Sequence, residues 1–286
     1  GGPNDWHMMH LGRLAIGGCG IVFGEETAVE PDGRKTHSCA GLYHQSHIAA
    51  YRRLTDMIKQ HGAVPAIQLG HSGRKGSCHG AIEDWRPLTV EDAKSGLPPW
   101  QIMTPSAAIS PPRPIPPKEM DHDDIKRVIE AFRTATKRSI DAGYDIVEIH
   151  GAHGYLIHQF LSSSANQRDD TYGGSLENRM RFAVEVGAAV REEWPQDKPV
   201  FFRLSAVDGK GGSWRLTDSI ALAKALRVVD IDVVDVSSGG VTGSSDMPTV
   251  PRIPAYQASF SSHIRYEAKI KTVAVGGITT AKQAED

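Results

Sequence analysis

Six short apolar runs, rich in β-branched residues, alternate with helical patterns along most of this chain. Several of the runs are almost continuously hydrophobic, which is typical of parallel strands buried on both faces. They lie at residues 19–29, 63–71, 144–151, 199–206, 231–238 and 271–277. Because regular alternation of strands and helices produces a parallel sheet, we predict an α/β protein.

The segments between the runs carry helix signals, and the best defined of them covers residues 122–143. Its apolar residues repeat with the spacing of one helical face: Ile125, Val128, Ile129 and Phe132. Asp121 is the predicted N-cap and Gly143 the predicted end. Further helices are predicted at residues 46–61, 176–194, 216–229 and 257–269.

Two folds combine a parallel sheet with such helices: a doubly wound sheet and a (β/α)₈ barrel. A doubly wound nucleotide-binding sheet normally has G-x-G-x-x-G after its first strand, and none of the six runs is followed by this motif. Polar residues instead lie toward the C-terminal ends of several strands: Glu26, Gln68, His150, Arg203 and Ser237. A barrel gathers strand ends at one face, so we predict a single (β/α)₈ TIM-barrel domain over residues 1–286. Six strands are two short of closure, and the first and last strands are therefore expected to be missing from this chain.

One connection, residues 72–121, is long and reads as irregular. Eight prolines fall between Pro98 and Pro117. We predict an insertion that shapes or covers the active face, with a solvated connector as the alternative.

Composition excludes several classes of function. The net charge is −2 with no long run of either sign, so neither a nucleic-acid nor a membrane-surface partner is expected. No apolar run approaches the ~20 residues that span a bilayer, and no signal peptide is recognisable. Three cysteines are too few for a disulfide framework. These features favour a cytoplasmic location.

Three histidines and a tyrosine lie close together in the stretch HGAHGYLIH, residues 150–158. Neutral imidazoles of His150 and His153 can each donate an N–H to one carbonyl oxygen that gains negative charge during a reaction. The phenol of Tyr155 can supply a proton. The alternatives are structural histidines and a metal site built from His150, His153 and His158, as in a metal-dependent barrel hydrolase.

Gln68 and Arg203 end two apolar strands, where an unpaired polar group is costly. The amide of Gln68 can bind an N–H/C=O edge of a heterocyclic ring or a neighbouring loop. The guanidinium of Arg203 can stabilise negative charge on a reduced cofactor ring or form a structural ion pair with a barrel carboxylate.

Small residues follow the last two runs. Backbone N–H groups near Ser237 and Gly276 can approach a phosphate, although glycines there can also simply form turns. Arg74 and Lys75 can reach substrate or phosphate, but as loop charges they are expected to be exposed and without a specific role.

Taken together, these residues resemble the old yellow enzyme family of FMN-dependent ene-reductases, and most closely its bacterial NADH:flavin oxidoreductase branch. The resemblance runs from Asn4 to the end of the chain. The stretches that carry it are NDWHMMHLGRLAIGGCG, AIQLGHSGRK, EIHGAHGYLIHQFLSSSANQRDDTYGGSLENRMRF and VDVSSGG.

The resemblance implies a barrel that holds FMN at its mouth, takes hydride from NAD(P)H and reduces activated alkenes such as enones. Gln68 would hold the pyrimidine edge of the flavin and Arg203 would lie beside N1. His150 and His153 would bind the substrate carbonyl, and Tyr155 would donate the proton. Cofactor contacts are also implied for two further positions, Ser237 and Gly276. No metal is implied, His158 would be structural, and a homo-oligomer is possible.

The chain departs from the family pattern at several points. Glu26 occupies a cofactor-contacting position that more often holds a small residue, and its backbone would then make the contact. The family's first strand, which carries a redox-tuning Cys or Thr, would precede Gly1. The eighth strand, which carries a Gly-Arg pair, would follow Asp286. An inactive barrel fragment is therefore an alternative to an enzyme.

Overall fold

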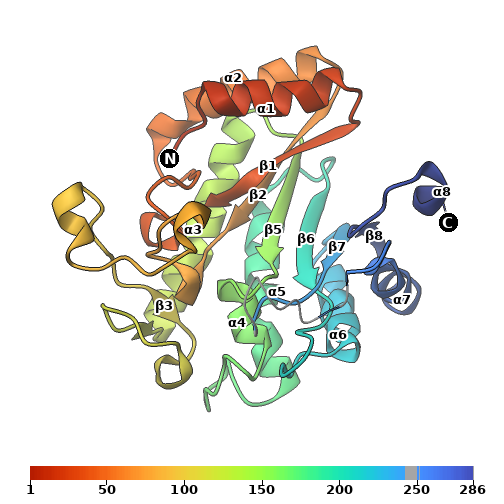
Figure 1. Cartoon of the computed structure of the whole chain (residues 1–286). Coiled ribbons are helices and arrows are strands. Elements are labelled where there is room, and N and C mark those ends of the chain that lie inside the picture. The colour runs from red at the N-terminus through yellow and green to blue at the C-terminus, as the bar shows by residue number, and fades with distance from the viewer. Residues whose placement is uncertain (242–249, 251, 286) are drawn as a thin grey trace.

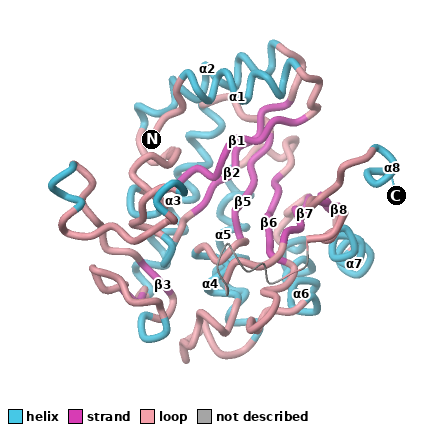
Figure 2. Tube along the Cα trace, viewed as in Figure 1, coloured by secondary structure: helices cyan, strands magenta, loops and turns pink. Residues whose placement is uncertain are grey.

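The computed structural model describes residues 1–241, 250 and 252–285, and six of its strands form one parallel sheet in the order β1-β2-β5-β6-β7-β8 (Figures 1 and 2). The strands are β1 (Ile21–Ala28), β2 (Val64–Gly70), β5 (Ile146–Gly151), β6 (Val200–Ser205), β7 (Val233–Ser237) and β8 (Lys271–Ala274). Each strand lies within one of the six predicted runs. The predicted strand order along the chain is thus confirmed.

Helices connect successive strands. They are α1 (Asp5–Ile16), α2 (Ile48–Gln60), α3 (His122–Asp141), α4 (Leu156–Leu161), α5 (Leu176–Glu193), α6 (Leu216–Val228), α7 (Ala258–Ala268) and α8 (Ala281–Glu285). Figure 1 shows α1 and α2 beside β1 at one edge of the sheet and α7 beside β8 at the other. The five predicted helices are confirmed as α2, α3, α5, α6 and α7.

The local sequence explains the position of α3. Asp121 accepts hydrogen bonds from the backbone N–H groups of residues 123 and 124, as an N-cap does. Val128 and Phe132 are fully buried, and Ile129 is partly buried against the same core. Gly143 follows the helix with φ +83°, a left-handed conformation that favours glycine.

The two faces of the sheet carry different side chains, because successive residues of a strand point to opposite sides. In β6, Phe202 and Leu204 join the large core between the sheet and its helices. The alternate residue Phe201 joins a second apolar cluster with Ala66, Ile146 and Val233. This second cluster forms an apolar floor on the inner face, and the polar residues lie above it toward the carboxyl ends of the strands.

The insertion at residues 72–121 is more ordered than its sequence indicates. It contains a two-stranded parallel sheet of β3 (Met103–Thr104) and β4 (Lys118–Glu119). Arg113 donates a hydrogen bond of 2.7 Å to the backbone carbonyl of Arg74. Short strand pairings and side-chain bonds to backbone carbonyls thus order a segment whose sequence has no periodic pattern. Within the insertion, β3 packs against the turn at residues 73–75, which follows β2.

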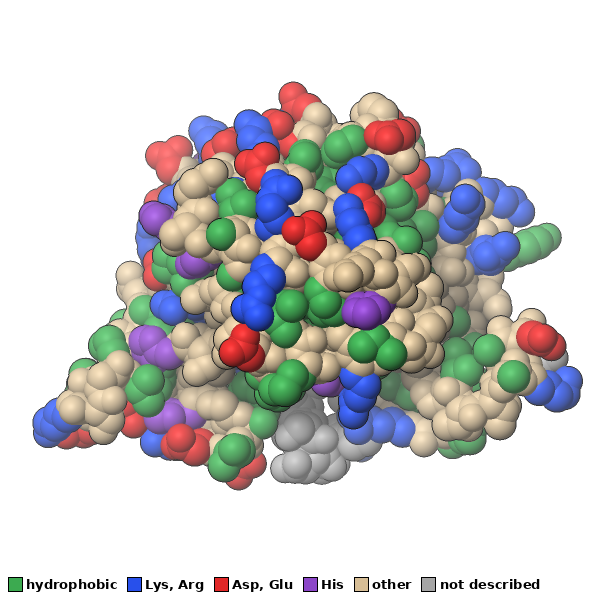
Figure 3. All heavy atoms as spheres, turned by 90° about the horizontal axis from the view of Figure 1, so that it is seen from above, with side chains coloured by type: hydrophobic (Ala, Val, Ile, Leu, Met, Phe, Trp, Pro, Cys, Tyr) green, Lys and Arg blue, Asp and Glu red, His purple; other side chains and the backbone are tan. Residues whose placement is uncertain are grey.

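The sheet is open in the described part of the chain, where β1 and β8 each pair with one neighbouring strand. Its order is that of consecutive strands in a barrel. Seen over α1 and α2, acidic and basic side chains are interspersed (Figure 3), in keeping with the small net charge. No helix among the described residues is long and apolar enough to cross a bilayer.

Candidate active site

The carboxyl ends of the parallel strands bring the predicted site residues together. In the sheet register Glu26 pairs with Gln68, His150 with Arg203, and Ser205 with Ser237. Because side chains two residues apart share a face, Gln68, His150, Arg203 and Ser237 all belong to the inner face, above the apolar floor. The gathering of these residues at one end of the sheet follows from the parallel topology.

A chain of hydrogen bonds links the two histidines. His150 Nδ1 accepts a bond of 3.2 Å from the backbone N–H of Ala152, so its proton is assigned to Nε2. This N–H points to His153 Nδ1 at 3.3 Å, and His153 Nε2 in turn lies 2.6 Å from Ser237 Oγ. His153 has φ +59°, in the turn that places its ring beside that of His150. Both imidazoles are thus held as neutral donors.

Burial fixes the protonation states of this group. It lowers the pKa of His150 well below its ordinary value, and nearby His153 adds to the effect. It also lowers the pKa of His153 to about 3, with a further contribution from Arg203. The ring of Tyr155 lies 4.9 Å from that of His150, and burial raises the phenol's pKa. At neutral pH the site therefore holds two uncharged imidazoles and a protonated phenol.

The expected binding of one oxygen by both imidazoles stays a prediction. In the structure the N–H of His150 is directed to His153, and the N–H of His153 to Ser237. A carbonyl oxygen bound here would take the place of one of these acceptors.

A layer of buried polar side chains lies beneath the histidines. Gln68 Nε2 donates a 2.6 Å bond to Glu148 Oε1, and Arg203 Nε lies 3.3 Å from Asp235 Oδ2. The ion pair that sequence analysis left as an alternative for Arg203 is therefore present. Glu148 and Asp235 were missed, although the alternation of acidic with apolar residues in VEIH and VVDVS marks them as facing the same side as the site.

Glu26 points its side chain into the space beside β2. A Cβ on Gly70 would lie 2.3 Å from Glu26 Oε1, so only glycine fits at that position without movement. Glu26 Oε1 is buried and has no hydrogen-bond partner among the described residues. Burial, together with the charge of Glu25, raises the pKa of Glu26 to about 8. The carboxyl group is accordingly protonated at neutral pH.

Replacing Glu26 by glutamine is expected to raise stability at pH 8 and to change it little at pH 5. Between the ordinary pKa of 4.5 and the folded value of about 8, the folded state holds a proton that the unfolded state releases. The stability conferred by this proton therefore falls as pH rises through that window. Glutamine has no proton to lose, so Glu26→Gln should raise the free energy of unfolding at pH 8 by at least about 1 kcal/mol. Thermal unfolding at the two pH values measures it.

Glu177→Gln, on the exposed surface of α5, is the matched control, and its stability should stay within about 0.5 kcal/mol of the parent at both pH values. Equal effects of Glu26→Gln at pH 5 and pH 8 would contradict a buried, titrating carboxyl.

Gln257 links the predicted phosphate residues. Its Oε1 accepts a hydrogen bond from Ser238 and lies 3.5 Å from Ser237 Oγ, while its Nε2 donates to the carbonyl of Val275. A Cβ on Gly276 would lie 2.7 Å from Gln257 Nε2, and Gly276 has φ +103°. Ser237 and Gly276 thus belong to one cluster, where a glycine backbone is left accessible.

Arg74 and Lys75 are not the exposed loop charges that sequence analysis expected. Arg74 is buried and donates a 2.9 Å bond to the carbonyl of Val241. Lys75 Nζ donates bonds of 2.7 Å to the carbonyls of His153 and Gly240. That expectation was wrong because backbone carbonyls of two neighbouring loops turn toward these cations. Burial, with the charges of Lys35 and Arg74, lowers the pKa of Lys75 to about 8.

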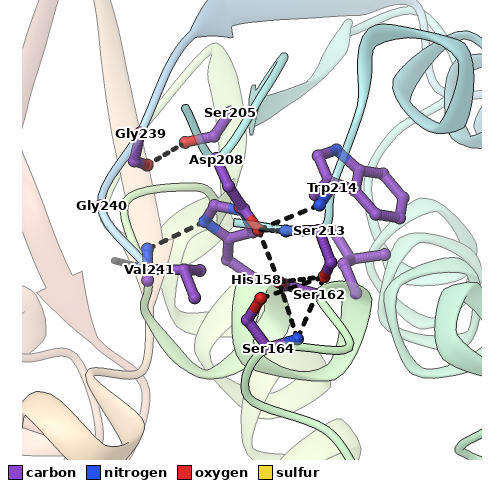
Figure 4. Close-up of polar contacts among 12 residues, drawn as sticks. His158, Ser162, Ser164, Ser205, Asp208, Ser213, Trp214, Gly239, Gly240 and Val241 are labelled. Carbon is purple, nitrogen blue, oxygen red and sulfur yellow. Dashed lines mark hydrogen bonds and ion pairs between the residues drawn. The ribbon is translucent and has the colours of Figure 1, made fainter. Parts of the chain in front are cut away.

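His158 does not join the other two histidines. Its Nδ1 accepts a bond from the backbone N–H of Gly154, and its Nε2 lies 2.8 Å from Asp208 Oδ1 (Figure 4). Both side chains are completely buried. The described residues contain no group of three or more His, Cys, Asp or Glu side chains that could hold a metal ion. The three-histidine metal site that sequence analysis left as an alternative is thus not assembled among the described residues, and the contacts of His158 suit a structural residue.

The residues present fit the FMN that the family resemblance implies. Arg203 Nε is buried and has no well-directed hydrogen bond among the described residues, so its charge is only partly satisfied by Asp235. The amide nitrogen of Gln68 is bonded to Glu148, so its carbonyl oxygen is the atom that could bind a cofactor at the carboxyl ends of the strands. Two further glycines near Ser237, Gly239 and Gly240, have φ of +74° and +104°, left-handed conformations that favour glycine. A flat ring with an anionic tail matches this set of donors.

Comparison with known proteins gives a consistent result. The model of the NADH:flavin oxidoreductase / NADH oxidase family matches residues 1–286. The NADPH dehydrogenase of Clostridium acetobutylicum is 41% identical over 290 residues, which cover all of this chain and 78% of that protein. The NADPH dehydrogenase of Geobacillus sp. strain WCH70 is 40% identical over 287 residues, covering 100% of this chain and 76% of the relative.

Solved structures agree. The old yellow enzyme homologue from Zymomonas mobilis superposes with a TM-score of 0.77 at 26% identity, over 100% of this chain and 77% of that one. A 2-naphthoyl-CoA reductase complex gives a TM-score of 0.83 at 27% identity, with this chain spanning 43% of its length. These neighbours confirm the predicted TIM-barrel class. The chain therefore belongs to the NADH:flavin oxidoreductase family, the old yellow enzyme family, and is an FMN-dependent oxidoreductase that uses NAD(P)H.

Proposed function

We propose that this enzyme reduces the activated C=C bonds of enones and related small electrophilic alkenes. The observation that supports this most is the neutral imidazole of His150, which packs against both neutral His153 and the protonated Tyr155. Bound FMN would supply the chemistry of hydride transfer from NAD(P)H to an electrophilic carbon. The protein's part is to bind the substrate oxygen and to supply a proton.

The cofactor contacts in this proposal come from five residues: Glu26, Gln68, Arg203, Ser237 and Gly276. Gln68 would meet the pyrimidine edge through its free carbonyl oxygen. Arg203 would stabilise negative charge at the ring edge, because its Nε carries no well-directed hydrogen bond within the described residues. Ser237 and the backbone at Gly276 would contact the ribityl and phosphate groups, and Glu26 would contribute its backbone.

The substrate contacts come from His150, His153 and Tyr155. A neutral imidazole N–H can stabilise a developing oxyanion without first losing a proton. The N–H at Nε2 of His150, which now points to His153, would instead donate its hydrogen bond to the substrate oxygen. Tyr155, packed against His150, would give its proton to the α-carbon of the alkene. The raised pKa of the phenol keeps that proton in place at neutral pH.

A metal-dependent hydrolase and an inactive barrel fragment were the alternatives. The hydrolase would need His158 as its third metal ligand, but His158 contacts Asp208 instead. The flavin-binding experiment below tests the inactive fragment. A cytoplasmic location belongs to the proposal and is supported by the free thiols of Cys19, Cys39 and Cys78.

The test begins with purified protein mixed with FMN. We expect bound flavin in the visible spectrum, bleaching by NADPH or NADH without oxygen, and recovery of colour when an α,β-unsaturated ketone is added. A saturated ketone of the same size is the control and should leave the flavin bleached. Bleaching without recovery by any enone or nitroalkene would overturn the proposed substrate class, and absence of flavin binding would support the inactive fragment.

A further inference from the structure

Two buried carboxyl groups face each other beneath the proposed flavin site. Glu148, on β5, is 1% exposed, and Asp235, on β7, is 7% exposed. Their side chains lie close enough across the inner face of the sheet for a hydrogen bond between them to influence the pKa of each. Two carboxylates cannot make such a bond, because neither oxygen carries a hydrogen.

The remaining contacts identify where a proton is needed. Glu148 Oε1 accepts from Gln68, and Asp235 Oδ2 faces Arg203. The other two oxygens, Glu148 Oε2 and Asp235 Oδ1, are buried without any donor among the described residues. A proton on Glu148 Oε2, donated to Asp235 Oδ1, satisfies both atoms at once.

Charge leads to the same conclusion. Arg203 is the cation that faces this pair, Gln68 is neutral, and His150 above it is uncharged. On β1, Glu26 is the register partner of Gln68 and is protonated at neutral pH. With both carboxyls ionised the layer would carry an excess negative charge over an apolar floor, whereas one shared proton makes it neutral.

We infer that Glu148 and Asp235 share one proton, carried by Glu148, and that this proton completes a continuous chain from Gln68 through Glu148 and Asp235 to Arg203. The inference rests on the proposed FMN site. Glu148 and Asp235 are positioning residues: they turn the amide of Gln68 and the guanidinium of Arg203 toward the mouth. They also leave the charge of Arg203 balanced by only one carboxylate.

The pKa directions agree with this assignment. Burial raises the pKa of Glu148 to about 8, and the charge of Asp235 adds to the increase. Burial also raises the pKa of Asp235, but Arg203 opposes that effect. Glu148, which is farther from the cation in the chain of contacts, is the group that keeps the proton.

The test is the FMN reduction potential of Glu148→Gln, Asp235→Asn and the double variant at pH 7. Glu148→Gln replaces a neutral acid by a neutral amide. Asp235→Asn allows Glu148 to ionise in its place. The reduction potential reports the ratio of the affinities for reduced and oxidised FMN. In each single variant this ratio should therefore stay within about threefold of the wild-type ratio. The double variant adds a positive charge and should raise the ratio by about tenfold or more.

Two independently ionised carboxylates give the opposite pattern, in which each single variant raises the ratio and the effects add. That pattern would overturn the inference. If either single variant fails to fold, the infrared carbonyl band of a protonated carboxyl group tests whether the pair holds a proton. The wild type minus variant difference at pH 7 should contain one such band for whichever single variant folds, and its absence would also overturn the inference.

The infrared measurement needs no cofactor. A wild-type protein that binds no FMN but gives the band in the wild type minus variant difference would contradict the proposed function and support the shared proton. A wild type that binds FMN normally but gives no such difference band would do the reverse.

Discussion

Replacing Asp208 by asparagine is expected to lower the free energy of unfolding by about 3–5 kcal/mol, a large share of the stability of a typical domain. Asp208 is completely buried, and several donor groups surround its carboxylate (Figure 4). His158 Nε2 lies 2.8 Å from Oδ1, and Ser162 Oγ donates a bond of 2.6 Å to Oδ2. The backbone N–H groups of Ser213 and Trp214 also donate to Oδ2, at 3.1 and 3.0 Å.

An asparagine would turn an N–H₂ group toward some of these donors, because an amide has one acceptor oxygen where the carboxylate has two. The loss would reach three parts of the fold, since Asp208 joins α4, the loop after α4 and the loop between β6 and α6. Chemical unfolding of both proteins measures the difference. Asp123→Asn on the exposed start of α3 is the control and should change stability by less than about 0.5 kcal/mol.

The pH dependence follows from the same contacts. Burial tends to raise the pKa of Asp208, but the hydrogen bond from His158 and the other donors outweigh it, and the net shift is downward. The stability conferred by a lowered carboxyl pKa is present above the unfolded value of 3.8 and is lost as pH falls through the folded value. The wild type should therefore lose stability in acid faster than Asp208→Asn. A variant as stable as the wild type at pH 7 would contradict a structural carboxylate.

The fold was predictable because the hydrophobic pattern of each element reflects its burial. Runs such as FFRLS and VVDVS are apolar along one face and at the start of the other, as in a parallel strand that is covered on both sides. The helix α3 was located by its apolar face and by the Asp121 cap. The pairings of β3 and β4 were missed because each has only two residues, too few for a periodic signal.

The candidate site was predictable where one residue broke an apolar run at its end, as Gln68, His150 and Arg203 do. Their proximity follows from parallel topology, which places the carboxyl ends of the strands at one face. The buried contacts of Lys75 and Asp208 were not predicted, because their partners are backbone groups and a side chain far along the chain. Contacts of that kind depend on how loops fold back, and local sequence does not contain that information.

Replacing Tyr155 by phenylalanine is expected to slow reoxidation of the reduced enzyme by an enone about 10²–10⁴-fold, the usual contribution of a positioned acid. The change removes one hydroxyl and keeps the ring, which packs edge-on to His150. Reduction by NADPH should change less than about threefold, because that step requires no proton from Tyr155. Stopped-flow measurement of the two half-reactions separates them. Tyr43→Phe, a half-buried tyrosine packed against His47, is the control and should leave both rates unchanged.

The pH profile distinguishes a proton donor from a residue that only shapes the pocket. Burial raises the pKa of Tyr155 and lowers those of His150 and His153, so these three groups should not titrate between about pH 5 and 9. If Tyr155 supplies the proton, the residual rate of Tyr155→Phe should depend on a proton from water, fall as pH rises and increase when a small acid is added to the buffer. The wild-type rate should not respond to the added acid. Equal losses in both half-reactions, with no response to added acid, would instead mean that Tyr155 positions the cofactor.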